Sequence, residues 1–171
     1  IVMDPRGVGL RRHASHMLQF RPGADVSMLN AIMHVIVEEG LYDQQYIDAY
    51  TENWDAGKEH LKGFSPETME PICGITPDVI RDVARTFAGA KAGMIFWGMG
   101  VSQHIHGTDN SRCLISLALM TGQVGRSGSG LHPLRGQNNV QGSCDMGSFP
   151  HELPGYRSVA DDNVRASFEE H

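Results

Sequence analysis

Short apolar runs alternate along the chain with longer stretches in which apolar residues recur every three or four positions. The runs at 1–3, 17–20 and 93–97 have the length of buried strands, and Pro or Gly follows each of them closely. Helical spacing predicts helices that start near Asp25, Asp43, Thr76 and residue 108 or 109. We expect Asp25 to cap its helix, and Thr76-Pro77 combines a capping residue with Pro at the first helical position.

Strands that alternate with helices predict an α/β fold. We expect an open, mainly parallel sheet flanked by helices, a Rossmann-like arrangement. The pattern is lost after Gly122, where seven glycines stand between residues 122 and 147 among many amide side chains. A loop of this length inside a compact domain is usually functional or disordered. The sequence therefore predicts one α/β domain over 1–147 that ends in a long Gly-rich loop, followed by a tail over 148–171.

Charge and cysteine content exclude several classes of protein. The 14 Lys and Arg stand against 20 Asp and Glu, a net charge of −6 that is opposite to that of most nucleic-acid-binding domains. The longest apolar stretch, 113–120, is too short to span a bilayer, so we expect no direct membrane insertion. Three scattered cysteines without a C-x-x-C pair predict neither a disulfide framework nor a metal site within the chain.

A reducing compartment fits these cysteines. We therefore expect a cytoplasmic protein, with a periplasmic location left open because the first residue is Ile1 rather than Met and an upstream segment is expected.

Three predicted strands run directly into loops that carry Asp or Gly. These loops are Asp4-Pro5-Arg6, 21–25 (RPGAD) and 97–100 (WGMG). Ligands bind at the carboxyl ends of strands in open α/β sheets, where an Asp accepts hydrogen bonds and a Gly allows close backbone approach. The pattern favours a nucleotide ligand, although ordinary turns explain it equally well, since the G-x-G-x-x-G motif is absent.

The run at 131–142 (LHPLRGQNNVQG) contains one Arg and four carboxamides, with no Lys and no acid. The planar donor fork of Arg135 matches the geometry of a carboxylate. Amide side chains add donors and acceptors without adding charge. The run suits a small anion or the edge of a heterocycle, and the alternative is an amide-rich loop that bonds its own backbone.

The run from Arg135 to Gly142, followed by 144–147 (CDMG), resembles the alpha subunit of formate dehydrogenases. These enzymes belong to the molybdopterin oxidoreductase superfamily. The segments 4–6, 21–25, 97–103 and 119–122 stand in the order that this family has. The resemblance implies one domain of a larger catalytic subunit that oxidises formate to carbon dioxide. In this family a molybdenum or tungsten ion is held by two molybdopterin guanine dinucleotides.

The resemblance also implies roles for individual residues. Arg135 corresponds to the arginine that lies beside the metal and orients formate, and is the implied catalytic residue. The implied cofactor-binding residues are Asp4, Arg6, Gly23, Asp25, Gly98, Met99, Gly100, Gln103, Gly136, Gln137 and Asn138. No metal ligand is expected within the chain, because the family's Cys or selenocysteine followed by His, and its iron–sulfur cysteines, lie upstream of the matched segment.

The expected partners are formate, the rest of the alpha subunit, and electron-transfer subunits with iron–sulfur clusters or flavin. An iron–sulfur cluster would belong to the upstream part of the full-length subunit. The chain by itself is expected to be inactive. Two alternatives stay open: a stand-alone nucleotide-binding module, and a domain of another molybdopterin oxidoreductase such as a nitrate reductase.

Overall fold

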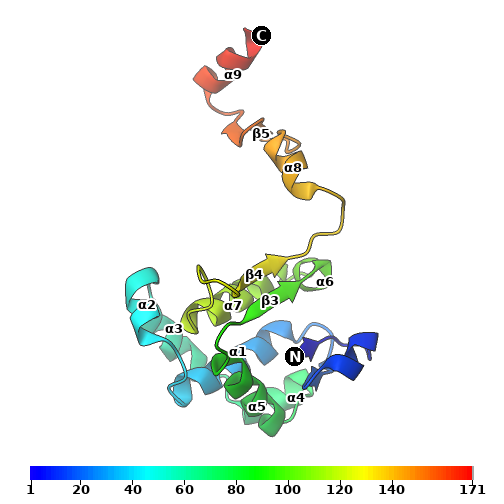
Figure 1. Ribbon diagram of the computed structural model, residues 1–171, viewed down its shortest axis with the longest axis vertical. Coiled ribbons are helices and arrows are strands. Elements are labelled where there is room, and N and C mark those ends of the chain that lie inside the picture. The colour runs from blue at the N-terminus through cyan, green and yellow to red at the C-terminus, as the bar shows by residue number, and fades with distance from the viewer. Residues whose placement is uncertain (171) are drawn as a thin grey trace. The chain divides into compact units, whose positions relative to one another are not determined.

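The computed structural model describes residues 1–170 and divides into two compact units, Ile1–Leu134 and the residues from Arg135 onward. Figure 1 shows the path of the chain through both. No helix among the described residues is long and apolar enough to cross a membrane. Each unit is described by itself.

The first unit contains four short strands and eight helical segments. The strands are β1 (Val2–Met3), β2 (Met17–Leu18), β3 (Met94–Trp97) and β4 (Gly130–Pro133). The helical segments are η1 (Gly9–His13), α1 (Asp25–Glu38), α2 (Gln44–Tyr50), α3 (Trp54–Leu61), α4 (Pro66–Cys73), α5 (Pro77–Ala88), α6 (Met99–Ser102) and α7 (Gly107–Met120). The predicted strands at 1–3, 17–20 and 93–97 and all four predicted helices are therefore confirmed as elements.

The strands form two separate parallel pairs. β1 pairs with β2, and β3 pairs with β4 in a register that places Ile95 opposite Leu131. The α/β class and the parallel pairing are confirmed. The single open sheet is not formed by residues 1–170, because no ladder joins β1 or β2 to β3 or β4.

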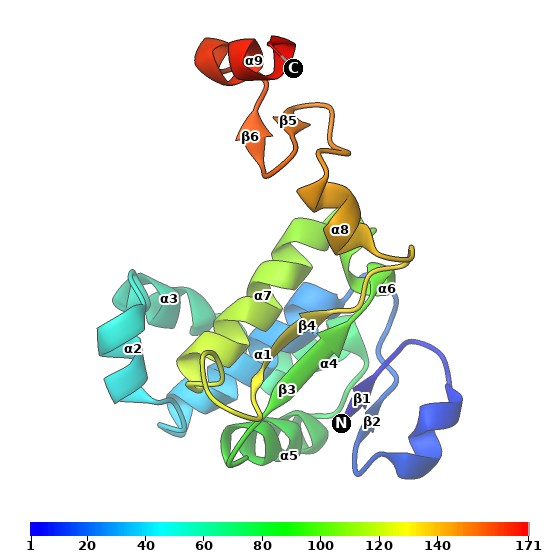
Figure 2. The same ribbon diagram turned by 45° about the horizontal axis from the view of Figure 1, so that its top comes forward.

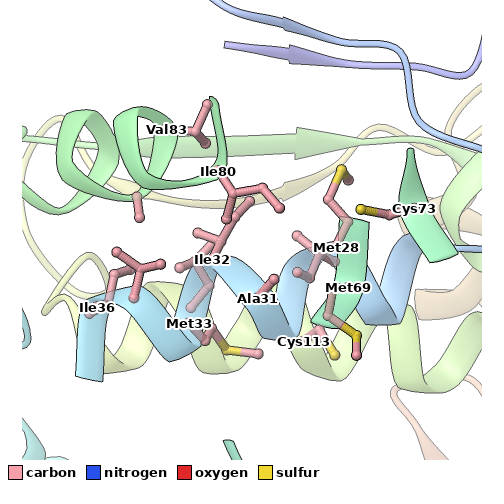
Figure 3. Packing of buried hydrophobic residues seen from close by; sticks show 14 of the residues in the cluster. Met28, Ala31, Ile32, Met33, Ile36, Met69, Cys73, Ile80, Val83 and Cys113 are labelled. Carbon is pink, nitrogen blue, oxygen red and sulfur yellow. The ribbon is translucent and has the colours of Figure 1, made fainter. Parts of the chain in front are cut away.

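Helix α1 is the centre of the core. Nine of its fourteen residues are buried, and it packs against α3, α4, α5 and α7. Figure 3 shows Ile32 and Ile36 of α1 beside Ile80 and Val83 of α5, with Cys113 of α7 on the other side. A helix buried on most of its surface is held in one position by its neighbours. Its first turn, which follows β2 after residues 19–24, is therefore fixed with it.

The helix starts agree with the sequence to within one residue. The Asp43 carboxylate caps α2 by accepting a hydrogen bond from Tyr46 N at 2.9 Å, and Pro77 is the first residue of α5. The prediction that Asp25 caps α1 is wrong: Ala24 is in the cap position and Asp25 is the first helical residue. The turn from Arg21 to Ala24 closes through a backbone bond of 3.1 Å, so the chain enters the helix one residue earlier than expected.

Strand β3 is exposed on one face, whereas its apolar sequence predicts burial on both. Met94 is 47% exposed and Phe96 is 57% exposed, while Ile95 and Trp97 pack against the core. In Figure 2 the pair β3–β4 lies in front of α1, with no other element of the first unit before it. The apolar face of this strand pair is therefore left uncovered by residues 1–134.

The predicted Gly-rich loop over 122–147 is also corrected. It contains β4, which forms by pairing with β3, and α8 (Val140–Asp145) in the second unit. Asn139 caps α8 in the left-handed conformation and accepts a hydrogen bond from Gly142 N at 3.2 Å. The rest of the second unit is an antiparallel pair, β5 (Glu152–Leu153) with β6 (Arg157–Ser158), and helix α9 (Asp162–Glu169).

Candidate functional site

Three of the predicted site segments of the first unit follow strands that point the same way. Asp4 follows β1, Gly23 and Asp25 follow β2, and Gly98 follows β3. Figure 2 shows β1, β2 and β3 running in one direction. A groove of about 230 Å³ is lined by Met3, Asp25 and Trp97 among other residues, so these three strand ends border one space. This is the edge at which open α/β sheets bind ligands.

Asp4 and Arg6 form a local pair at the end of β1. The Asp4 carboxylate accepts hydrogen bonds from Arg6 N at 2.8 Å and from Arg6 Nε at 3.3 Å. The side-chain bond from Arg6, followed by the backbone bond, lowers the pKa of Asp4. Asp4 is thus a carboxylate held in place, and the Arg6 guanidinium beside it is open to solvent.

The segment Arg21-Pro22-Gly23 is a tight turn between β2 and α1. Ala24 N bonds to Arg21 O, and Gly23 has a φ of 84°, which is the geometry of a type II turn with Pro and Gly at its centre. A side chain at position 23 would be strained by this φ although nothing lies within 4 Å of its Cβ position. Gly23 therefore serves the turn itself.

Asp25 is a buried carboxylate at the first position of α1. It is 7% exposed as a whole residue and lines the groove, and its oxygens are not among the buried side-chain atoms that lack a hydrogen-bond partner. The N-terminus of α1 favours a negative charge there. A carboxylate that lines a groove can accept hydrogen bonds from the N–H or O–H groups of a ligand.

The loop after β3 folds into the short helix α6. Gly98 and Gly100 have nothing within 4 Å of the position that a Cβ would occupy, so a ligand can approach the backbone at both. The exposed side chains of Met99 and Gln103 touch, with Gln103 Nε2 lying 3.4 Å from Met99 Sδ. The backbone of the loop after β3 is therefore open at Gly98 and Gly100.

The remaining predicted site residues begin the second unit. Arg135, Gly136, Gln137 and Asn138 are all exposed. Arg135 has a φ of 61°, in a region that few residues with a side chain adopt. Within the part of the chain that the structure describes, no carboxylate pairs with its guanidinium. Because the two units are separate compact bodies, the geometry of Arg135 relative to Asp4, Asp25 and Gly98 stays a prediction.

Sequence reasoning missed the residues that position α6 and β3. Asn110 of α7 is 2% exposed and donates through Nδ2 to Val101 O at 2.8 Å. Gln123 is 1% exposed, and its Oε1 accepts from Gly93 N at 2.8 Å at the start of β3. A Cβ at Gly107 would lie 1.8 Å from Ser102 O. The contact of Gln123 is distant in the sequence, and helical or strand periodicity marks none of the three residues.

The three cysteines form no disulfide among residues 1–170. Cys73 and Cys113 are buried, and all three cysteines are free thiols. Burial, with the charge of Asp109 nearby, raises the pKa of the Cys113 thiol to about 11. Its Sγ lies 3.6 Å from Asn30 Oδ1, so Cys113 is a neutral, hydrogen-bonded core residue. Among residues 1–170 no group of three or more His, Cys, Asp or Glu could hold a metal ion.

Known proteins of one family match the chain over nearly its whole length. The family model described as molybdopterin oxidoreductase matches residues 1–168. The chain is 43% identical over 168 residues to formate dehydrogenase H of Escherichia coli, and 42% identical over 161 residues to the F420-dependent formate dehydrogenase subunit alpha of Methanocaldococcus jannaschii. It is 36% identical over 170 residues to a nitrate reductase of Synechocystis.

These alignments cover 98%, 94% and 99% of this chain but 24% of each relative. The chain thus spans about a quarter of the length of the curated relatives it matches. The solved structure of acetylene hydratase from Pelobacter acetylenicus shares the fold, with a TM-score of 0.70 at 23% identity, over 74% of this chain and 18% of that one. The predicted resemblance to formate dehydrogenases is confirmed.

Proposed function

Since the chain belongs to the molybdopterin oxidoreductase family, we propose that it is part of the catalytic subunit of a formate dehydrogenase. The full-length protein oxidises formate to carbon dioxide, and the present chain is inactive alone because it spans about a quarter of its relatives. The observation that carries this proposal is Arg135. It is an exposed guanidinium on a left-handed backbone, at the start of the run that resembles formate dehydrogenases.

The bound cofactor is proposed to be bis(molybdopterin guanine dinucleotide) with molybdenum or tungsten, which supplies the two-electron redox chemistry. Asp25 accepts hydrogen bonds from the donor groups of one guanosine, since it lines the groove at the first position of α1. Gly98 and Gly100 let the cofactor reach the backbone, because their Cβ positions face open space.

The other proposed contacts lie at the edges of this binding surface. Asp4, Arg6 and Gly23 border the same guanosine end at the carboxyl ends of β1 and β2. Met99 and Gln103, which touch each other on α6, cover the cofactor next to Gly98. Gly136, Gln137 and Asn138 line the cofactor side and the substrate channel next to Arg135 in the sequence.

Arg135 orients the substrate. Two parallel N–H groups of its guanidinium hold the two oxygens of formate, and so fix the direction of the C–H bond that is oxidised. Formate carries one negative charge and carbon dioxide carries none. Arg135 therefore binds the substrate more strongly than the product, and the product leaves as its charge pairing is lost.

The electrons leave through parts of the protein outside this chain. We propose an iron–sulfur cluster in the upstream region of the same subunit, and partner subunits with iron–sulfur clusters or flavin that pass the electrons to the final acceptor. The segment 1–147 is proposed as the cofactor-binding domain, with 148–171 leading to the next domain of the subunit.

The test of this function is Arg135→Ala in the full-length enzyme. Loss of the bidentate contact should lower formate turnover by about 10²–10³-fold, the range found when one preorganised donor is removed. The metal and pterin content should stay close to that of the unsubstituted enzyme. Arg135→Lys keeps the charge without the planar fork and should recover only part of the activity. Unchanged formate turnover in Arg135→Ala would contradict the proposal that Arg135 orients formate.

A second candidate is a nitrate reductase, which the 36% identity to the Synechocystis enzyme over 99% of the chain favours. Nitrate is also a planar anion that an arginine fork can hold. Assays of the full-length enzyme with formate plus an oxidised dye, and with nitrate plus a reduced dye, separate the two. Nitrate reduction without formate oxidation would decide for the second candidate.

A further inference from the structure

Non-glycine residues with positive φ gather in the second unit. Arg135, Asn139 and Tyr156 have φ values of 61°, 51° and 58°, and among residues 1–170 only Asn53 is another such residue. This conformation is unfavourable for a residue with a side chain and persists where surrounding contacts hold it. Asn139 caps α8, and Tyr156 lies in the turn between β5 and β6. Tyr156 is thus held in its turn by contacts with the rest of the unit.

The hydroxyl group of Tyr156 is bonded to the first turn of α8. Gln141 Nε2 donates hydrogen bonds to Tyr156 Oη at 2.7 Å and to Asp145 Oδ1 at 3.0 Å. A hydrogen bond with Asp145 raises the pKa of Tyr156 above its ordinary value, so the hydroxyl stays protonated. A protonated phenol accepts and donates at once, so Tyr156 can bond to Gln141 and Asp145 together. Figure 2 shows the turn between β5 and β6 directed toward α8.

The same turn packs against the C-terminal end of α8. Gly155 N donates to Asp145 O at 2.8 Å. At Gly147 a Cβ would lie 2.7 Å from the backbone N of Pro154, so the chain after α8 lies directly on the backbone of the turn. Tyr156 holds the first turn of the helix and Gly155 holds its last residue. One turn therefore fixes both ends of α8.

The segment that carries Arg135 leads into this helix. No backbone hydrogen bond among residues 1–170 involves residues 135–138, so the segment does not hold itself in one conformation. A helix of six residues is too short to be stable alone, so α8 also depends on its contacts. Asn139 joins the two, since its Oδ1 accepts a hydrogen bond from Gly142 N at 3.2 Å. The direction in which Arg135 is presented therefore follows from the position of the first turn of α8.

We propose that Tyr156 is a positioning residue for formate: its hydroxyl, bonded to Gln141, fixes the first turn of α8 and with it the segment of Arg135. This inference rests on the proposed role of Arg135 as the group that orients formate. Tyr156 acts through Gln141 and is assigned no contact with formate or with the cofactor. A planar guanidinium must meet both oxygens of formate at once, so its binding is sensitive to small displacements of the segment.

Tyr156→Phe in the full-length enzyme removes the hydroxyl and keeps the ring. The kcat/KM for formate should fall by about 3–10-fold, the factor expected for one hydrogen bond. Metal, pterin and guanine nucleotide content should equal that of the unsubstituted enzyme, because the proposed cofactor loops of the first unit are not altered. Tyr50→Phe on α2 is the matched control, since Tyr50 is 73% exposed, and should leave kcat/KM unchanged.

Amide hydrogen exchange measures the position of α8 without reference to activity. In Tyr156→Phe the amide of Gly142, bonded to Asn139 Oδ1, should exchange about 3–10-fold faster, because the first turn of α8 opens more often. The amide of Gly155 is the internal control, since its bond to Asp145 O does not depend on the hydroxyl. Unaltered exchange at Gly142 would contradict a hold on the first turn.

A double-mutant cycle tests whether Tyr156 acts through Arg135. In the Arg135→Ala background, Tyr156→Phe should change kcat/KM by less than about twofold, since no guanidinium is left to position. Gln141→Leu should reproduce the loss seen in Tyr156→Phe, and the two substitutions together should lose no more than either alone. A merely structural role of the hydroxyl would lower kcat/KM by the same factor in both backgrounds.

The outcomes separate this inference from the proposed function. An unchanged kcat/KM in Tyr156→Phe, together with a large loss in Arg135→Ala, would overturn the positioning role and leave the function of Arg135 intact. Equal losses in both backgrounds, or loss of cofactor from Tyr156→Phe, would also overturn the positioning role. Full activity of Arg135→Ala would overturn the proposed function itself, and this inference with it.

Discussion

The absence of a side chain at Gly107 allows α6 to fold back onto the first turn of α7. A Cβ there would lie 1.8 Å from the backbone oxygen of Ser102, and backbone cannot rotate away as a flexible side chain can. At Gly23 the reason for glycine is instead a φ of 84°. The sequence indicates a turn at Gly23, whereas only the structure shows that Gly107 is required for space.

The Gly107→Ala substitution in the full-length protein should displace α6. Overpacking of this kind destabilises by about 1–3 kcal/mol. Pulse proteolysis in urea, read on peptides from α6 and α7, measures the loss. Gly57→Ala on α3, where nothing lies within 4 Å of the Cβ position, is the matched control and should be neutral or slightly stabilising. Equal stability of the two variants would show that α6 tolerates the contact.

Asp25 illustrates what a single residue type can and cannot indicate. Its position after a strand and before a helix is readable from the sequence, and the structure keeps it there. Its burial is a tertiary property, because it follows from α1 being enclosed by α3, α4, α5 and α7. That property, more than the residue type, is what qualifies Asp25 as a ligand for donor groups.

At the scale of elements, helices were more predictable than strands. The helix α5 has Pro77 at its first position and an apolar stripe that includes Ile80 and Val83, which are local signals. The strand β4 is formed by Gly130–Pro133, of which only Leu131 is typical of a strand. It becomes a strand by pairing with β3, about 35 residues earlier, and a local pattern does not contain that information.

The helix α6 is the element that presents Gly98 and Gly100 to the proposed cofactor. The Gly100→Ala substitution should preserve α6, because the added Cβ meets nothing within 4 Å and Ala favours a helix. It should lower cofactor retention by about 10–100-fold if the cofactor approaches the backbone there, which corresponds to an overlap of 1–3 kcal/mol.

The pterin and guanine nucleotide content of the purified full-length variant measures this effect. The urea midpoint of the same preparation should be unchanged, and Gly57→Ala provides the matched control for the nucleotide content. Full cofactor content in Gly100→Ala would contradict close approach of the cofactor at α6.

At the scale of the whole molecule, α1 connects all the layers of the first unit. Ile32 is fully buried at its centre, and Figure 3 shows it pointing toward α5. Ile32 also lines the floor of the groove between the strand pairs. The stability of the core and the position of the predicted cofactor loops therefore depend on the same helix.

The Ile32→Ala substitution should destabilise this core by about 2–5 kcal/mol, through lost apolar burial and the cavity that remains. Ile105→Ala removes the same atoms from a side chain that is 96% exposed and should change stability by less than about 0.5 kcal/mol. Urea unfolding of the two full-length variants, measured by the proteolytic protection of α1 peptides, compares their stabilities. Similar losses for both variants would show that α1 is not the centre of the core.

The sequence by itself determined the α/β class, the positions of most helices, the loops after β1, β2 and β3, and the family resemblance that the comparisons confirm. These depend on local periodicity, turn residues and short motifs, which are properties of neighbouring residues.

Only the tertiary structure decided that the strands form two pairs, that β4 and α8 lie within the Gly-rich stretch, and that an apolar groove remains between β1 and β3. Pairing, burial and vacant space arise between residues far apart in the chain, so no local pattern specifies them.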